Sequence, residues 1–242
     1  MKLAIFGDTH GNLTALEAML GDSQTQGVDE FICIGDVASF GPQPQETLRR
    51  IKELECPVVM GNADAEMLNP TLTSDLSEPF KDIIGWCAQR PDDTDRTFIR
   101  TFRETVRLEL DGFPILCFHG SPKSYNDVIT ATTPDEALGM FFETRAPLMC
   151  GGHTHTQLLR RFQNVTFVNP GSVGLPHEVL KDGSVRNPAR AEYALVEINR
   201  GQPSVTFRRV SYDLEPLLEA VRTSGMPHAE TWSADWSGEP AP

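Results

Sequence analysis

The chain has 242 residues, of which 39% are hydrophobic and 23% charged, a composition that excludes a wholly disordered or a fibrous protein. Its 21 basic and 34 acidic side chains give a net charge of −13, which argues against binding to duplex nucleic acid or to anionic membranes. This length fits one α/β domain better than two, so we expect a single domain over residues 1–228 and a flexible tail over 229–242.

The sequence also bears on the cellular compartment. The apolar run at residues 3–6 is interrupted by Gly7-Asp8, too early for a signal-peptide core, and no other segment is long and apolar enough to span a bilayer. The five cysteines are scattered, odd in number and free of CxxC spacing, which disfavours a disulfide framework. We therefore expect a cytoplasmic protein with no membrane contact.

The first sixty residues alternate strand and helix patterns. The predicted elements, in chain order, are a strand over 2–6, a helix from an N-cap at Asn12 to about residue 20, a strand over 31–34, an amphipathic helix over 43–54 and a strand over 57–60. A βαβαβ order of this kind predicts parallel strands with right-handed crossovers.

A helical and acidic insertion follows at about 65–104, with helices predicted near 78–89 and 94–103. It could cover a pocket, form an oligomer contact or simply be solvated. Strands are next expected over 106–110 and 115–118, then a helix over 134–144 capped by Thr133, and a strand over 148–150.

The last third is mostly β. Strands are predicted over 158–162, 166–168, 193–198 and 204–211, followed by a helix over 214–223. From Ala229 onward the composition predicts a frayed tail unless Trp232 or Trp236 packs on the body.

Five short polar segments each follow an apolar strand pattern. They are Gly7-Asp8-Thr9-His10-Gly11-Asn12, Gly35-Asp36, Gly61-Asn62-Ala63-Asp64, His119-Gly120 and Gly151-Gly152-His153-Thr154-His155-Thr156. Ligands bind in open α/β sheets at the carboxyl ends of strands, and neighbouring strands lie about 4.8 Å apart, so these side chains can converge. Carboxylates, an amide and imidazoles suit divalent ions such as Mn²⁺, Fe²⁺, Co²⁺, Ni²⁺ or Zn²⁺. The sequence therefore predicts a metal site.

The ordered pattern GDTHGN, GD, GNAD, HG and GHTH resembles the calcineurin-like metallophosphoesterases, especially their compact bacterial and archaeal phosphodiesterase and phosphatase branch. Gly41-Pro42 and the stretch Asn169-Pro170-Gly171-Ser172-Val173-Gly174 fit the same branch. The resemblance runs from residue 2 to about 213. It implies a four-layer α/β/β/α sandwich of two mixed sheets with a dinuclear metal centre between them.

The resemblance also implies a ligand set. One metal would be held by Asp8, His10 and His155, the second by Asn62, His119 and His153, and Asp36 would bridge the two. Manganese is the metal we expect, with Fe, Zn, Ni or Co as alternatives. Two divalent cations outweigh two aspartates, so a strongly anionic protein can present a cationic pocket. A hydroxide shared by the two metals would attack phosphorus, with Asp36, Asn62 and His119 supporting it through the metals.

One position departs from the family pattern. Many members carry a histidine after the asparagine of the third segment, where this chain has Ala63. A general acid contributes about 10²–10⁴-fold, so its absence favours phosphodiesters or good leaving groups over alkyl phosphomonoesters.

Three further polar residues are open to two interpretations each. Asp64 could orient a ligand histidine or be a surface turn residue. Asn12 could contact phosphate or only cap its helix. His177 could approach the site from its loop or be solvated.

The expected function is metal-dependent hydrolysis of a small or nucleotide-like phosphoester. The alternatives are a phosphatase for phosphoproteins or diadenosine polyphosphates, and a catalytically weak interaction scaffold like the retromer-type relatives. An oligomer is compatible with the sequence. There is no Gly-Lys-Ser/Thr phosphate loop and no GxSxG elbow.

Overall fold

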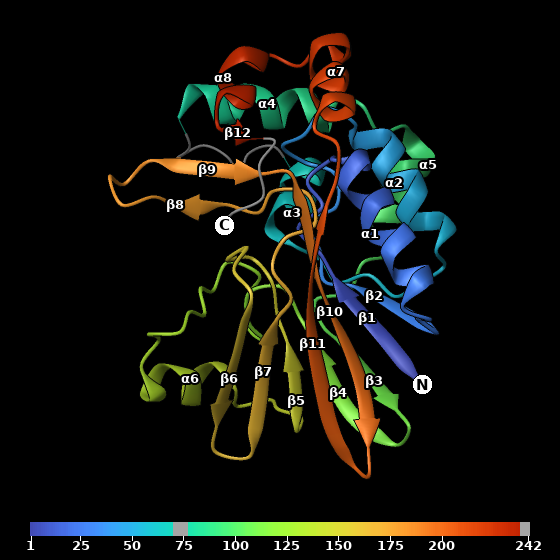
Figure 1. Cartoon of the computed structure of the whole chain (residues 1–242), viewed down its shortest axis with the longest axis vertical. Coiled ribbons are helices and arrows are strands. Elements are labelled where there is room, and N and C mark those ends of the chain that lie inside the picture. Colours follow the sequence, from blue (N-terminus) through green and yellow to red (C-terminus); the bar gives the residue numbers. More distant parts are fainter. Residues whose placement is uncertain (70–76, 238–242) are drawn as a thin grey trace.

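The computed structural model describes residues 1–69 and 77–237. Two sheets stand side by side with helices around them (Figure 1). The first sheet has the order β11-β10-β1-β2 and the second the order β3-β4-β5-β7-β6. The strands of the first sheet are β1 (Lys2–Phe6), β2 (Glu30–Cys33), β10 (Arg190–Asn199) and β11 (Gln202–Ser211). Those of the second are β3 (Val106–Leu110), β4 (Phe113–Cys117), β5 (Leu148–Cys150), β6 (Leu158–Phe162) and β7 (Val165–Asn169).

Both sheets are mixed. Strand β1 pairs in parallel with β2, as the βαβ pattern predicts, and antiparallel with β10. In the second sheet β5 lies parallel to both β4 and β7, while the edge strands β3 and β6 are antiparallel to their neighbours. The parallel strands β1, β2, β4 and β5 are those whose carboxyl ends carry the polar segments.

Alternating side chains divide the apolar interior into three clusters. Leu3 and Ile5 of β1 join a cluster between the two sheets, whereas Ala4 and Phe6 join one beneath the helices. Strand β4 repeats the pattern, because Ile115 faces the first sheet and its neighbour Leu116 packs in a third cluster with residues of the α6 region. Three interfaces between layers are those of an α/β/β/α sandwich, so the predicted fold class is confirmed.

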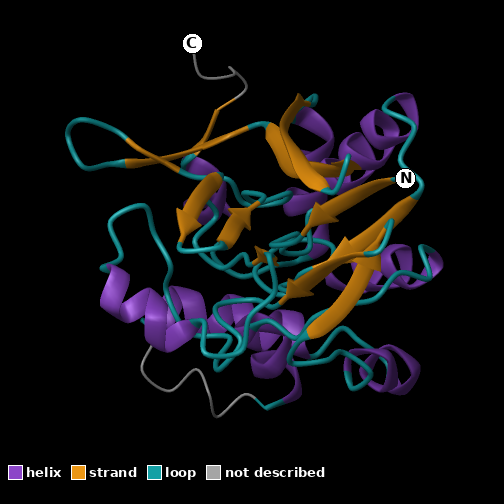
Figure 2. Cartoon of the chain, turned by 90° about the horizontal axis from the view of Figure 1, so that it is seen from below, coloured by secondary structure: helices purple, strands orange, loops and turns teal. Residues whose placement is uncertain are grey.

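Helix α6 lies beside the second sheet, and the other helices of the described ranges lie on the side of the first sheet or above the two sheets (Figure 1). Figure 2 shows the helices around the strands from a second direction. The helices of the described ranges are α1 (Leu13–Thr25), α2 (Pro44–Glu53), α3 (Asn62–Leu68), α4 (Glu78–Ala88), α5 (Asp93–Ile99), α6 (Asp135–Phe141), α7 (Glu215–Ser224) and α8 (Ala229–Ala234). Within residues 1–69 and 77–237, every helix is too short or too polar to traverse a lipid bilayer.

Several expectations need correction. The strand predicted over 57–60 makes only isolated bridges, from Val58 to Cys33 and from Val59 to Arg103. Helix α6 begins after Pro134 and has no side-chain cap, so Thr133 is not its cap. The short strands β8 (Glu178–Val179), β9 (Val185–Pro188) and β12 (Trp236–Ser237) form a small additional sheet that we did not predict.

The region after Ala229 depends on its two tryptophans, as the sequence suggested. Trp232 in α8 and Trp236 in β12 are both buried, and their rings lie 5.2 Å apart between centroids. Burying two indoles stabilises an otherwise polar segment, so residues 229–237 are ordered elements. The remainder of the predicted tail, 238–242, lies outside the described residues.

Candidate metal centre

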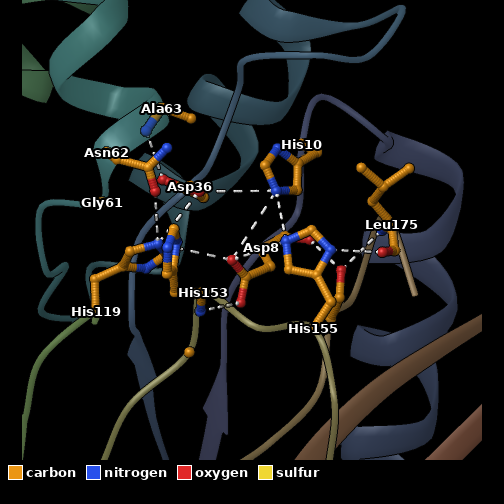
Figure 3. A network of polar contacts seen from close by, with 12 residues as sticks. Asp8, His10, Asp36, Gly61, Asn62, Ala63, His119, His153, His155 and Leu175 are labelled. Carbon is orange, nitrogen blue, oxygen red and sulfur yellow. Dashed lines mark hydrogen bonds and ion pairs between the residues drawn. The ribbon is translucent and has the colours of Figure 1, made fainter. Parts of the chain in front are cut away.

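The five polar segments meet at one end of the two sheets. Figure 3 shows that the loops after β1, β2, β4 and β5 and the start of α3 bring their side chains to one point. Asp8, His10, Asp36, His153 and His155 all have positive φ, between 48° and 69°, although none is glycine. Such a backbone costs energy and clusters at functional sites. A Cβ at Gly61 would lie 2.0 Å from Asp36 Oδ1, so only glycine permits this approach.

Three of the four histidines are fixed in the same way. Nδ1 of His10 lies 3.0 Å from Ser39 O, Nδ1 of His119 2.8 Å from Ile34 O, and Nδ1 of His155 2.7 Å from Leu175 O. A carbonyl can only accept, so each Nδ1 carries a proton. When such a ring is neutral, the lone pair of Nε2 therefore points into the centre, which is the tautomer that metal-ligating histidines adopt.

The side chains form two groups. Asp8, His10 and His155 offer ligand atoms that all lie within 4.8 Å of one another, and so do Asp36, His119 and His153. In the first group His10 Nε2 and His155 Nε2 are 3.1 Å apart, and His155 Nε2 is 3.4 Å from Asp8 Oδ1. In the second group Asn62 Oδ1 lies 3.2 Å from His119 Nε2. The structure thus brings together all seven residues named from the sequence.

Each aspartate has one oxygen held by a backbone N–H and one turned toward imidazoles. Asp36 Oδ1 accepts from Ala63 N at 2.8 Å, and its Oδ2 lies 3.3 Å from His119 Nε2 and 3.8 Å from His10 Nε2. Asp8 Oδ2 accepts from His153 N at 3.2 Å, while the buried Oδ1 has no hydrogen-bond partner among the described residues. Asp36 therefore lies between the two groups.

The aspartates and histidines of this centre shift one another's pKa values. Burial raises the pKa of Asp36, but His119 and His10 outweigh it and leave the pKa well below its usual range. Burial lowers the pKa of His119, yet the carboxylates of Asp36 and Asp8 raise it to about 10. The pKa of His155 is raised despite burial, chiefly by Asp8. By contrast, burial and the charge of His155 keep the pKa of His10 low.

The donor set fits divalent cations. Asp8 Oδ1 has no hydrogen-bond partner among the described residues, and His10 Nε2 lies 3.1 Å from His155 Nε2. Because both rings already carry a proton on Nδ1, a positive charge is needed between these atoms. Aspartate, asparagine and histidine are ligands that Mn²⁺, Fe²⁺, Co²⁺ and Zn²⁺ accept.

Asp64 supports this centre in a different way from the one expected. Its buried carboxylate accepts from the backbone N–H groups of Asp36 at 2.8 Å, Val37 at 2.9 Å and Gly61 at 3.0 Å, and within the described ranges it bonds no histidine. Burial and the charge of Asp36 raise the pKa of Asp64 to about 7. The prediction that Asp64 orients a histidine is therefore wrong, because it ties two loop backbones together.

Asn12 is a helix cap. Its Oδ1 accepts from Ala15 N at 3.0 Å, and its amide donates to Gly174 O at 2.9 Å and to Tyr212 OH at 3.1 Å. The side chain is completely buried. Because both protons of the Asn12 amide are already donated within the protein, the predicted phosphate contact is not supported.

His177 does approach the centre, although its residue is exposed. Its ring centroid lies 5.5 Å from that of His155. His177 also lines a cavity of about 530 Å³ beside His153 and Thr154. The sequence could not place this histidine, because its approach depends on the loop between β7 and β8. The carbonyls of Ile34, Ser39 and Leu175 also escaped prediction, since backbone groups carry no residue-type signal.

Comparison with known proteins agrees with this geometry. Residues 1–201 match the model of the calcineurin-like phosphoesterase superfamily domain. The chain is 23% identical to the uncharacterized protein MJ0912 of Methanocaldococcus jannaschii, over 98% of this chain and 96% of that one.

Solved structures show the same fold. A metallophosphoesterase from Sphaerobacter thermophilus superposes with a TM-score of 0.75 at 24% identity, covering 97% of this chain and 99% of the other. The hypothetical protein PH1004 from Pyrococcus horikoshii OT3 superposes with a TM-score of 0.82 at 18% identity, covering 99% of both chains. With the family match over most of its length, the chain belongs to the calcineurin-like phosphoesterase superfamily.

Proposed function

We propose that this protein hydrolyses phosphodiesters with the aid of two divalent cations, most suitably Mn²⁺, with Fe, Zn, Ni or Co as alternatives. The observation that carries the proposal is the 3.1 Å approach of His10 Nε2 to His155 Nε2, two lone pairs that repel each other unless a proton or a cation lies between them. Asp8, His10 and His155 would hold one cation and Asn62, His119 and His153 the other. Asp36 would contact both, because its Oδ2 lies within 3.8 Å of a histidine of each group.

Bound cations supply a nucleophile from water near neutral pH and neutralise phosphoryl oxygens during in-line attack. The chain's own residues do the rest. The Ser39, Ile34 and Leu175 carbonyls hold the imidazoles in the ligating tautomer, and the N–H groups of Ala63 and His153 hold the two aspartates. All these groups are fixed before substrate arrives, so little reorganisation is needed during the reaction.

The substrate preference follows from Ala63. A methyl group cannot protonate a leaving group, so esters with good leaving groups, and diesters rather than alkyl monoesters, are the substrates that this site favours.

The five cysteines are free thiols, in keeping with a reducing compartment.

Hydrolysis of bis(p-nitrophenyl) phosphate tests the proposal. We expect activity in Mn²⁺ that disappears with chelator and returns when Mn²⁺ is added back, together with about two metal ions per chain by elemental analysis. Activity that persists after complete metal removal would contradict a metal-dependent reaction. A protein that binds metal but hydrolyses no phosphoester in a broad panel would favour the scaffold alternative.

Metal loading should release protons. The pKa of His119 is raised to about 10, so this residue is protonated at pH 7 in the metal-free protein and must lose its proton to ligate a cation. Affinity for Mn²⁺ should therefore rise with pH, by about tenfold per pH unit for each proton released. Calorimetric titration in two buffers of different ionisation enthalpy measures the number of protons, and a value of zero at pH 7 would contradict this prediction.

Ala63→His should restore acid assistance. We expect hydrolysis of an alkyl phosphodiester to rise by about tenfold or more, and that of a p-nitrophenyl ester to change little, because only the poor leaving group needs a proton. Ala63→Gln is the matched control, since it adds size and polarity without an acid. Because Ala63 is buried, the thermal midpoint of each variant is measured too. Equal changes for both esters would exclude a general-acid role at position 63.

A further inference from the structure

A second cavity, which we call the aromatic cavity, adjoins the metal centre. It has a volume of about 440 Å³, within the usual range for small-molecule sites. Four separate parts of the chain form its walls: the loop after β2, helix α4, the segment from the Leu175 loop through β9, and helix α8. The side chains that matter below are Phe40, Phe80, Leu175, His177, Asn187 and Trp232.

The aromatic cavity and the metal centre share their supporting backbone. The Ser39 carbonyl bonds His10, and the next residue, Phe40, lines the cavity. The Leu175 carbonyl bonds His155, while Leu175 itself also lines the cavity. His177 borders this cavity and the one beside His153. A group bound in the aromatic cavity therefore lies next to a phosphate held at the metals.

Three large aromatic side chains, those of Phe40, Phe80 and Trp232, lie in the wall of the cavity. Phe40 and Phe80 stack with their centroids 5.3 Å apart and their planes at 14°, and Phe80 remains 48% exposed. Trp232 is buried and its Nε1 donates to Phe40 O at 2.9 Å. Phe40 has a φ of +77°, a strained value for a bulky side chain. The fold therefore tolerates a strained backbone conformation at Phe40, which places an aromatic ring in the wall of the cavity.

One polar side chain in the wall of the cavity, that of Asn187, has no hydrogen-bond partner among the described residues. The backbone N–H of Asn187 donates to Asp235 O at 2.7 Å, and the residue is only 8% exposed. Its carboxamide lines the cavity and makes no hydrogen bond with any described part of the chain. A carboxamide offers both a donor and an acceptor, so a ligand that displaces water from it without replacing these hydrogen bonds loses binding free energy.

We infer that the aromatic cavity binds the nucleobase of a nucleoside phosphodiester, with the base against Phe80 and its polar edge at Asn187. The inference rests on the proposed function, since it places the phosphate at the metals. Hydrolysis adds water across one P–O bond and yields a phosphomonoester and an alcohol, and the alcohol oxygen keeps one proton of the water. A hydrocarbon chain fits the apolar walls less well, because it leaves the Asn187 carboxamide unpaired.

Two esters that release the same p-nitrophenolate test this inference. In Mn²⁺, kcat/KM for thymidine 5′-p-nitrophenyl phosphate should exceed that for methyl p-nitrophenyl phosphate by about tenfold or more, as base stacking on an aromatic ring predicts. Phe80→Ala and Asn187→Ala should each lower this ratio several-fold. Leu159→Ala, at a residue 45% exposed on β6, is the control that should leave the ratio unchanged.

Binding is measured separately from catalysis. With chelator present, thymidine should change the tryptophan fluorescence of the chain, because Trp232 lines the cavity. Without chelator, thymidine should leave the affinity for Mn²⁺ unchanged. If neither ester is hydrolysed but thymidine still binds, the proposed function fails and the cavity assignment stands. Equal kcat/KM for both esters with no thymidine binding would overturn the assignment, and so would a preference for an alkyl ester with a long chain.

Discussion

Asp36→Asn should nearly abolish phosphodiester hydrolysis and weaken the binding of both metal ions together. The substitution keeps the size of the side chain but removes the negative charge of Oδ2, the atom that lies 3.3 Å from His119 Nε2 and 3.8 Å from His10 Nε2. Loss of a group that only supports a ligand costs about 10–100-fold, so loss of a ligand shared by both metals should lower kcat by more than about 100-fold.

Elemental analysis and kcat for bis(p-nitrophenyl) phosphate, measured on the same preparation, test this prediction. Asp111→Asn is the matched control, because Asp111 lies in the exposed turn between β3 and β4 and pairs only with the N-terminal amine among the described residues. Full metal content with retained activity in Asp36→Asn would refute the shared position of Asp36. Loss of one metal alone would assign Asp36 to a single site.

Strand–loop patterns made most of the centre predictable. Residues such as Asp8 and His119 follow short apolar runs, and strands that lie parallel in a sheet bring their carboxyl ends to one edge. These patterns located the five polar segments, and the family resemblance selected from them the seven residues that the structure brings together. Their role as ligands remains a prediction. The same reasoning gave β1, β2, β4 and β5 to within one or two residues.

Local patterns were insufficient where tertiary contacts decide the structure. Helix α3 has seven residues and begins inside the third polar segment, so it has no apolar periodicity from which a helix could be predicted. Strands β8 and β9 are short and largely polar, and they pair mainly with each other and with β12. The segment at 57–60 is apolar enough for a strand, but each of its two middle residues bridges a different neighbour.

The aromatic cavity illustrates a second limit. The cavity joins residues that are up to 192 positions apart, as Phe40 and Trp232 are. Each of them alone is consistent with an ordinary core or surface residue. The left-handed backbone of Asp8, His10 and Asp36 is equally invisible in the sequence, because none of them is glycine. Only the folded chain shows that the loop orienting His10 also presents Phe40 to a cavity.

Asp64→Ala should be the most destabilising single change near the metal centre. The carboxylate is fully buried and accepts from three backbone N–H groups, two of which belong to Asp36 and Val37. Each buried donor left without a partner costs about 1–3 kcal/mol, so the free energy of unfolding should fall by roughly 3 kcal/mol or more. Activity should fall as well, because the backbone that carries Asp36 loses its anchor.

Urea unfolding of the metal-free protein measures this effect without contributions from bound ions. Asp64→Asn should lose less stability than Asp64→Ala, because its remaining oxygen can still accept hydrogen bonds. Asp135→Ala is the control at an exposed carboxylate that pairs with Arg160, and it should cost at most about 1 kcal/mol. If Asp64→Ala unfolds within about 1 kcal/mol of the parent chain, the three N–H groups find other partners, and Asp64 does not hold the Asp36 loop against Gly61. A large loss of stability for Asp64→Ala and a smaller one for Asp64→Asn would identify Asp64 as the residue that ties the Asp36 loop to Gly61.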